Sequence, residues 1–369
     1  MKSLYSYKKP PLIFEKQYSV GQGGLHAGII THKDVDVYIY DCGAYKQKNI
    51  ENGIDELIND LKKYKNINTI RVFISHFHND HVNGLDYLYD KLKGCVSYSH
   101  LELILPSISE YEKIFMLGHY YENDGQNNFK YEKFIINPTE YFNDKYRVIF
   151  LTNEYPPPEL NYNTIYDKPM PFDKDKISDS HNYVFKNNTY NDIIWIYKTY
   201  YCPIDKKKFK LLKAEIENAQ IDLSNATKDK QKEVRAIYNK YYKNINESSM
   251  CLYSGPQKEH VIGWMHTGDI KLKNEYLKEF INKYKDILDN ILIFQIPHHG
   301  SEYNSSKNDL IKIKNASCFY ITVQNKKTKS KSIPKIADEY KKDAIRINEH
   351  FSLTFSLYEK RIMPVILFS

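Results

Sequence analysis

The stretch SHFHNDHVNG at residues 75–84 concentrates side chains that bind metal ions. His76, His78, Asp80 and His81 fall within six residues, although the whole chain has 13 histidines in 369 residues. Imidazole and carboxylate groups suit zinc, manganese and iron. If the backbone is extended here, His76 and His78 project to the same side, and Asp80 and His81 follow after a turn. Four ligands would crowd one ion, so we expect two ions, one held by the first pair and one by the second.

Two more stretches, far along the chain, contain candidate ligands. MHTGDI at 265–270 places Asp269 in a Gly-Asp turn, where its carboxylate can bridge two ions, and IPHHGS at 296–301 places His298 beside His299. Each stretch follows an apolar run that we interpret as a strand, and open α/β sheets bind ligands at the C-terminal ends of their strands. We therefore expect the three stretches to meet in one site, with Asp80 and Asp269 as its catalytic carboxylates.

The segments around these stretches alternate between strand and helix patterns. They are a strand, turn and strand at 12–43, a helix at 54–66, a buried strand at 69–75, two strands at 249–269, a helix at 274–289, a strand before PHHGS, a strand at 316–324, a helix at 333–343 and a final strand at 351–357. This alternation favours an α/β fold in which two sheets pack on each other with helices outside.

Residues 106–245 have a different character. We predict that 106–204 is rich in loops, and that 205–243 forms one or two charged helices with loose apolar spacing. We interpret this region as an insertion that packs on one edge of a single domain spanning 1–369. The insertion is also a candidate surface for a protein partner.

Composition narrows the class of protein. Hydrophobic residues make up 41% and charged residues 27%, as in globular proteins with a large core. The five cysteines are odd in number and widely spaced, which predicts a reducing compartment rather than a disulfide framework. No secretory leader and no run of about 18 apolar residues is visible, so we expect a cytoplasmic protein without a membrane segment. The formal net charge of +7 hints at an anionic partner.

Five stretches together resemble a known family. They are VGQGG at 20–24, YIYDCG at 38–43, SHFHNDHVNGL at 75–85, NESSMCLYSG through MHTGDI at 246–270, and PHHGS at 297–301. They are similar to the metallo-β-lactamase superfamily and, within it, to the hydrolase domain of the ComEC-type competence proteins, which take up DNA. The match covers about residues 15–100 and 245–358. The resemblance implies a four-layer αβ/βα sandwich, here with a large, partly helical insertion, and a dinuclear metal site between the sheets.

The resemblance also implies how the ligands divide between two divalent ions. His76 and His78 would bind the first ion, Asp80 and His81 the second, and Asp269 would bridge them. The final ligand would be His298, with His299 as the alternative. Zinc fits these ligands, and manganese is the alternative.

Other residues are expected to support the site. Asp41 would orient a ligand histidine through a hydrogen bond. Ser301 and the backbone near Gly300 would contact oxygen atoms of the substrate, and His299 and His26 are further candidates for supporting or substrate-binding roles.

The chain departs from the family at several positions. Many superfamily members supply one more histidine from mid-chain, and His100, His119 and His181 are all candidates for that ligand. A His-Pro pair of the competence-type pattern is replaced by Ile333 and Pro334. Two further histidines, His266 and His350, could substitute for that histidine. No membrane channel like that of the competence proteins is visible in these residues, so we do not expect the role in DNA uptake.

The expected chemistry is hydrolysis. Two ions about 3.5–4 Å apart can share a hydroxide, which would be the nucleophile. Such a site polarises carbonyl and phosphoryl groups alike. The family resemblance, the positive net charge and the Lys-rich stretch at 324–332 favour a phosphodiester substrate, with DNA or RNA as the candidate partner. The alternatives are hydrolysis of an ester, a lactone or a phosphorylcholine-like group, and a metal-binding module without catalysis.

Overall fold

The structure is a computed structural model, and it describes most but not all of the chain. The described residues are 12–31, 34–122, 128–151, 184–188, 194–201, 206–221, 228–245, 249–256, 263–313, 316, 318–323, 344–358 and 361–365. Several expectations therefore lie outside the described residues: the Lys-rich stretch at 324–332, the helix at 333–343 with its Ile333 and Pro334, and His181.

The first sheet has eight strands in the order β15-β14-β1-β2-β3-β4-β5-β6. Strands β3 to β6 run parallel, and the pairs from β15 to β3 are antiparallel. The strands are β1 (Ile13–Gln17), β2 (Gly23–Thr31), β3 (Val35–Ala44), β4 (Ile67–Phe73), β5 (Tyr98–Pro106), β6 (Arg147–Leu151), β14 (Leu353–Tyr358) and β15 (Arg361–Val365).

The second sheet has seven strands in the order β13-β12-β11-β10-β9-β8-β7. Strands β10 to β13 run parallel, and the pairs from β7 to β10 are antiparallel. The strands are β7 (Val184–Asn188), β8 (Ile194–Tyr201), β9 (Met250–Pro256), β10 (Gly263–His266), β11 (Ile291–Gln295), β12 (Cys318–Thr322) and β13 (Ile345–Ile347). Both sheets are thus mixed.

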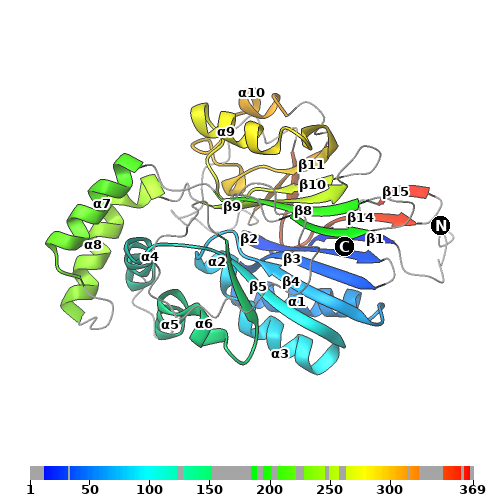
Figure 1. The fold of residues 1–369 in the computed structure, drawn as a ribbon, viewed down its shortest axis with the longest axis horizontal. Coiled ribbons are helices and arrows are strands. Elements are labelled where there is room, and N and C mark those ends of the chain that lie inside the picture. The colour runs from blue at the N-terminus through cyan, green and yellow to red at the C-terminus, as the bar shows by residue number, and fades with distance from the viewer. Residues whose placement is uncertain are drawn as a thin grey trace.

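Helices lie outside the two sheets, some on their outer faces and others at one end of the molecule (Figure 1). They are α1 (Gln47–Leu61), α2 (Asn79–Val82), α3 (Leu85–Cys95), α4 (Glu110–Glu122), α5 (Asn128–Ile136), α6 (Pro138–Phe142), α7 (Lys206–Asn218), α8 (Lys228–Ile245), α9 (Asn274–Tyr284) and α10 (Lys307–Leu310), with short 3-10 turns η4 (Leu288–Asn290) and η5 (His298–Gly300). Helices α1 and α3 lie on the side of the first sheet, and α9 and α10 lie on the side of the second (Figure 1).

The alternation of side chains along each strand explains the layers. In β3, Val37 and Ile39 are buried in the cluster that contains Leu57 of α1. The intervening Tyr38 and Tyr40 face the other way and belong to a cluster with strands of the second sheet. Successive residues of a strand point to opposite faces, so a strand that is apolar on both faces is covered on both. The two sheets therefore pack on each other between two layers of helices.

Most of the predicted elements are found, and the α/β class is confirmed. Two expectations differ. The described part of 106–204 contains the helices α4 to α6 and the strands β6 to β8, which extend both sheets, where we predicted mainly loop. The strand at 351–357 is not the final one, because β15 follows and pairs with it. Among the described residues, no helix combines the length and the apolar character that crossing a membrane requires.

Candidate metal centre

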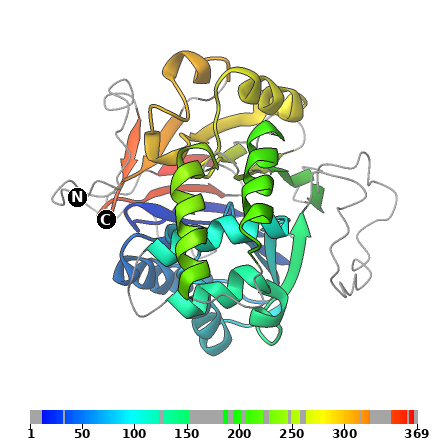
Figure 2. The same cartoon turned by 90° about the vertical axis from the view of Figure 1, so that its left-hand side faces the viewer.

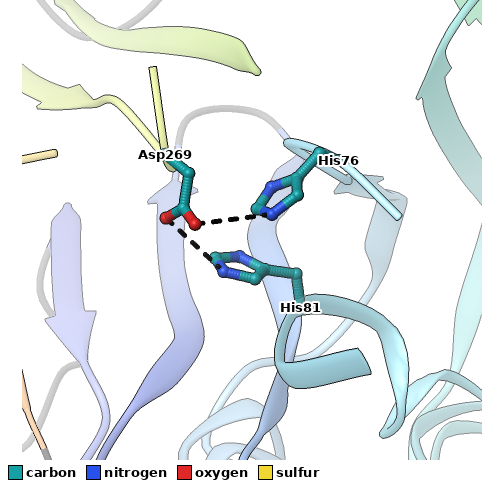
Figure 3. A group of neighbouring side chains, drawn as sticks. All are labelled: His76, His81 and Asp269. Atoms are coloured by element: carbon teal, nitrogen blue, oxygen red, sulfur yellow. Dashed lines mark ion pairs between the residues drawn. The ribbon is translucent and has the colours of Figure 1, made fainter. Parts of the chain in front are cut away.

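The candidate ligands lie on three loops that follow the C-terminal ends of strands. His76 follows β4 of the first sheet, and Asp269 and His298 follow β10 and β11 of the second. A backbone hydrogen bond of 2.8 Å from the Met250 N–H to the Ser75 carbonyl joins the two sheets at this point. The ligands therefore come together where the two sheets meet, as Figure 3 shows for three of them.

The first group of neighbouring side chains is His76, His81 and Asp269 (Figure 3). The two carboxylate oxygens of Asp269 point at different imidazoles. Its Oδ2 lies 3.6 Å from His76 Nε2, and its Oδ1 lies 3.8 Å from His81 Nε2. All three residues are buried. A carboxylate with one oxygen toward each of two histidines has the geometry of a bridging ligand.

The second group is Asp80, His81 and His299. Asp80 Oδ1 lies 3.9 Å from His81 Nε2, and Asp80 Oδ2 lies 3.6 Å from His299 Nε2. Because His81 belongs to both groups, the two form one continuous cluster. His299, the alternative to His298 in the sequence analysis, is therefore the member of that pair that lies beside Asp80.

His298 and His78 lie at the edge of the same cluster. His298 Nε2 is 3.6 Å from Asp269 Oδ2, the oxygen that also faces His76. His78 Nδ1 is 2.9 Å from His76 Nε2. Both side chains are partly exposed, unlike His76 and His81. With Asp80, which is also partly exposed, His78 and His298 therefore mark the open side of the cluster.

A β-bulge places Asp41 under the cluster. Leu25 pairs with Cys42 and His26 pairs with Tyr40, so Asp41 is the extra residue of β3. Its φ is 58°, a left-handed conformation that aspartate tolerates better than most residues. Bulges commonly re-aim a side chain next to a functional site. Here the bulge turns the Asp41 carboxylate toward the ligand loop.

Asp41 orients the imidazole of His81. Its Oδ2 accepts a hydrogen bond of 2.8 Å from His81 Nδ1 and one of 2.9 Å from the Ser75 hydroxyl, and its Oδ1 accepts the Ser75 N–H at 2.7 Å. The Ser75 hydroxyl lies 2.9 Å from His76 Nδ1. With their Nδ1 atoms engaged, both imidazoles direct Nε2 toward Asp269. Histidines that ligate metals are oriented in this way by a partner on the other ring nitrogen.

The two histidines of the second loop are oriented by the same device. His299 Nδ1 lies 2.9 Å from the Thr322 carbonyl, and His298 Nδ1 lies 2.8 Å from the Asn304 amide oxygen. The Asn304 amide nitrogen donates to the Asp269 carbonyl at 2.9 Å, which ties the His-His loop to the Asp269 turn. Both histidines have positive φ, 49° and 54°. Such a conformation costs free energy in residues other than glycine and is concentrated at functional sites.

Glycines allow the ligand loop to lie close to its neighbours. A Cβ on Gly43 would stand 2.5 Å from the backbone of Asp80 and His81, and one on Gly24 would stand 2.6 Å from Asp41 Cβ. Gly23 has a φ of 130°, which few other residues adopt. Gly23, Gly24 and Gly43 are therefore required by the close approach of the backbone to the site.

The buried charges shift the pKa values of the cluster. Burial opposes a charge on His81, but the carboxylates of Asp41 and Asp80 raise the pKa of His81 to about 10. Burial also acts to raise the pKa of Asp80, yet the charge on His81 lowers it well below its usual range. Burial lowers the pKa of His76 well below its usual range. The Asp80 carboxylate is thus kept ionised beside a protonated His81, and a metal ion that binds His81 would displace that proton.

The donor set fits divalent metal ions. The Nε2 atoms of His81 and His299 are buried and have no hydrogen-bond partner among the described residues. Metal–nitrogen and metal–oxygen bonds of about 2.0–2.2 Å in a tetrahedral arrangement put ligand atoms about 3.4 Å apart. The histidine Nε2 atoms of the cluster lie 3.6–3.9 Å from the carboxylate oxygens of Asp80 and Asp269, which is close to that value. We conclude that these side chains can hold metal ions.

Four further residues named from the sequence lie elsewhere or have other partners. His26 is buried between the sheets, 2.9 Å from Glu15, and His266 lies beside Tyr38 in the same interior. His100 is exposed near the start of β5, whereas the ligand loop follows the opposite end of the neighbouring β4. Ser301 is buried, and its hydroxyl accepts the Tyr303 N–H.

Two other candidate histidines belong to elements other than the three ligand loops. His350 is exposed on the loop between β13 and β14, and its N–H donates to Asn348. His119 is in α4, and its side chain is outside the described structure.

Sequence reasoning missed three residues that hold the ligands. They are Ser75, Thr322 and Asn304, which contact His76, His299 and His298 respectively. Ser75 stands directly before the first histidine, so its position next to the motif was a usable signal. Thr322 acts mainly through its carbonyl oxygen, which no side-chain pattern can reveal.

Comparisons of the chain with models of known protein families, with curated proteins and with solved structures found no match. The described residues establish an α/β protein with two mixed sheets and a buried cluster of histidines and aspartates that can hold metal ions. The functional assignment therefore depends on the chemistry of that cluster.

Proposed function

We propose that the protein is a metal-dependent hydrolase of the metallo-β-lactamase superfamily and that it cleaves phosphodiester bonds at a site for two divalent ions. One observation carries the proposal: Asp269 directs one carboxylate oxygen to His76 and the other to His81, and it is itself buried. The five resembling stretches add support, because their described residues lie on the elements that build this cluster. The layers of helix, sheet, sheet and helix agree with the αβ/βα sandwich of that superfamily.

Two sets of side chains would hold the ions. His76, His78 and Oδ2 of Asp269 would bind the first ion, with His298 approaching the same oxygen. Asp80, His81, His299 and Oδ1 of Asp269 would bind the second. We thus assign His299, rather than His298, to the second ion. Zinc suits these ligands, and manganese is the alternative.

Divalent ions at this position would lower the pKa of water toward neutrality and polarise a phosphoryl or carbonyl group. The chain itself supplies the positioning. Asp41 fixes the ring orientation of His81, and Asn304 fixes both His298 and the Asp269 turn. The partly exposed side of the cluster, between His78 and His298, would receive the substrate.

The experiment combines metal analysis with an activity panel. The purified protein, loaded with Zn²⁺ or Mn²⁺, should hold about two equivalents of metal and cleave bis(p-nitrophenyl) phosphate, DNA or RNA. Replacing a supporting residue behind a metal ligand typically costs 10–100-fold, so Asp269→Asn should cost more than about 100-fold in rate. The matched control is His100→Gln, which removes an exposed histidine remote from the cluster.

The outcomes separate the interpretations. If esters, lactones or phosphorylcholine compounds are cleaved and phosphodiesters are not, the protein is a hydrolase, but the proposed substrate class is wrong. If Asp269→Asn keeps full metal content and activity, the assignment of the site is wrong. If the wild-type protein binds metal and cleaves none of these substrates, the cluster is a binding module rather than an active site.

A further inference from the structure

The positive charge of the chain is concentrated in two helices. Helix α7 has five lysines and two glutamates, a net charge of +3. Helix α8 has five lysines and one arginine against one aspartate and one glutamate, a net charge of +4. Together the two helices account for +7, the formal net charge of the whole chain, and the rest of the chain is balanced. We call α7 and α8 the basic arm.

The basic arm is a packed part of the fold. Leu212 and Ile216 of α7 and Val234 and Tyr238 of α8 are buried in the largest hydrophobic cluster. The Tyr238 ring lies 4.9 Å from that of Phe115 in α4. Figures 1 and 2 show the two helices side by side at one end of the molecule, beyond α4. An apolar face that is packed in this way holds the opposite face toward solvent.

That outer face presents lysines. Lys207 and Lys210 of α7 are exposed and, three residues apart, share one face of the helix. Lys232 and Lys240 of α8 have 79% and 60% of their side chains exposed. Some of these lysines make ion pairs, for example Lys232 with Asp229. Ion pairs at such exposure stabilise little, so these lysines can leave their acidic partners and bind phosphate groups instead.

The C-terminal end of the arm is close along the chain to the metal centre. Ile245, the last residue of α8, is four residues before Ser249, whose hydroxyl accepts the Asp269 N–H at 3.2 Å. Four residues span at most about 14 Å. Helix α4, on which the arm packs, follows the end of β5, and β5 runs parallel to β4. The arm and the ligand loop therefore leave the sheets at the same edge.

We infer that the basic arm binds the sugar-phosphate backbone of a nucleic acid and holds it beside the metal centre. A polyanion suits this surface because regularly spaced phosphates can contact lysines along both helices at once and release the counterions around them. The contacts would be independent of sequence, since lysines on a helix surface contact phosphates and not the edges of bases. The inference rests on the proposed phosphodiesterase function and names the class of substrate.

The test compares two triple variants of the full-length, metal-loaded protein. The arm variant is Lys207→Gln, Lys210→Gln and Lys232→Gln, which keeps good helix formers and removes three charges. The control variant is Lys62→Gln, Lys65→Gln and Lys285→Gln. These lysines are also exposed, but they precede β4 and β11 and so lie at the opposite edge of the sheets. The probe is a fluorescent 20-nucleotide single-stranded DNA of mixed sequence, titrated at several salt concentrations.

The arm variant should bind at least about tenfold more weakly at 0.1 M salt, and the slope of log affinity against log salt should fall by about 2, the loss of three phosphate contacts. The control variant should bind within about twofold of the wild type. Equal effects of both triples, a wild-type slope in the arm variant, or no binding by the wild type would each overturn the inference.

Hydrolysis of bis(p-nitrophenyl) phosphate separates this inference from the proposed function. That small substrate does not reach the arm, so the arm variant should cleave it at the wild-type rate. If the wild type hydrolyses the small substrate but DNA binding does not depend on the arm, the inference about the arm is wrong and the proposed function is unaffected. Arm-dependent DNA binding without any hydrolysis refutes the proposed function and leaves the arm as a nucleic-acid surface.

Discussion

The Asp41→Asn substitution tests how the cluster is held together. Asp41 is fully buried, and its two oxygens accept three hydrogen bonds, from His81 Nδ1, the Ser75 hydroxyl and the Ser75 N–H. An asparagine fits the same space and tolerates the φ of 58°. It has one acceptor oxygen, so its NH₂ group must face at least one of these donors. The substitution therefore changes the support of His81 and leaves the bulge intact.

The magnitude follows from what His81 would lose. If its Nδ1 no longer has an acceptor, the ring is free to change its tautomer or to turn, and Nε2 is no longer fixed toward Asp80 and Asp269. Loss of such a supporting partner typically lowers metal affinity by 10–100-fold. A tenfold change corresponds to about 1.4 kcal/mol, so the expected cost in binding free energy is about 1.4–2.8 kcal/mol.

The assay is a competition titration of the apo protein with Zn²⁺ against a chromophoric chelator. Two equivalents should bind to the wild type, and in the variant the second-ion set of Asp80, His81 and His299 should bind 10–100-fold more weakly. Asp144→Asn, which changes an exposed aspartate, is the control. If Asp41→Asn keeps wild-type affinity for both equivalents while remaining folded by circular dichroism, Asp41 does not support the metal centre.

Three further predictions follow from neighbouring contacts. Gly43→Ala should destabilise the protein by about 1–3 kcal/mol in urea unfolding, because its Cβ would stand 2.5 Å from the ligand loop. His299→Gln should remove one metal equivalent by elemental analysis, whereas His298→Gln should mainly weaken the other, and equal losses would contradict the assignment. Burial raises the pKa of Glu15 from 4.5 to about 8, so the folded state holds a proton that the unfolded state releases. The stability of the wild type relative to that of Glu15→Gln should therefore fall by about 1.4 kcal/mol per pH unit between pH 5 and pH 7.5, because the other titrating groups are common to both proteins.

The local part of the candidate site could be predicted from the sequence. His76, His78, Asp80 and His81 are neighbours in the chain, so a strand that ends before them is enough to bring them together. That Asp269 lies beside these residues could also be predicted, because functional sites of α/β sheets lie at the C-terminal ends of strands. The periodicity of the apolar runs similarly indicated most of the strands, because strands buried on both faces have short apolar segments with clear boundaries.

The rest depends on contacts that the pattern does not encode. Asp41 was expected to orient a ligand histidine, but the sequence did not show that this histidine is His81, because Asp41 reaches it through a one-residue bulge. His26 occupies the inward face of β2 and meets Glu15 between the sheets, although its position beside VGQGG pointed to the site. The strands β6 and β7 are edge strands, and β8 pairs with β7 next to the edge of the second sheet, where alternation is weak.

The energetics of the cluster favour a metal centre over a structural polar cluster. Desolvating a carboxylate costs several kcal/mol unless it is paired, and the cluster brings Asp41, Asp80 and Asp269 close together. A network selected for stability would satisfy every buried polar atom, since each one left unpaired costs about 1–3 kcal/mol. Here the Nε2 atoms of His81 and His299 are unpaired within the described structure and face carboxylates. Cations between those atoms would satisfy the imidazoles and offset the charge of the carboxylates together.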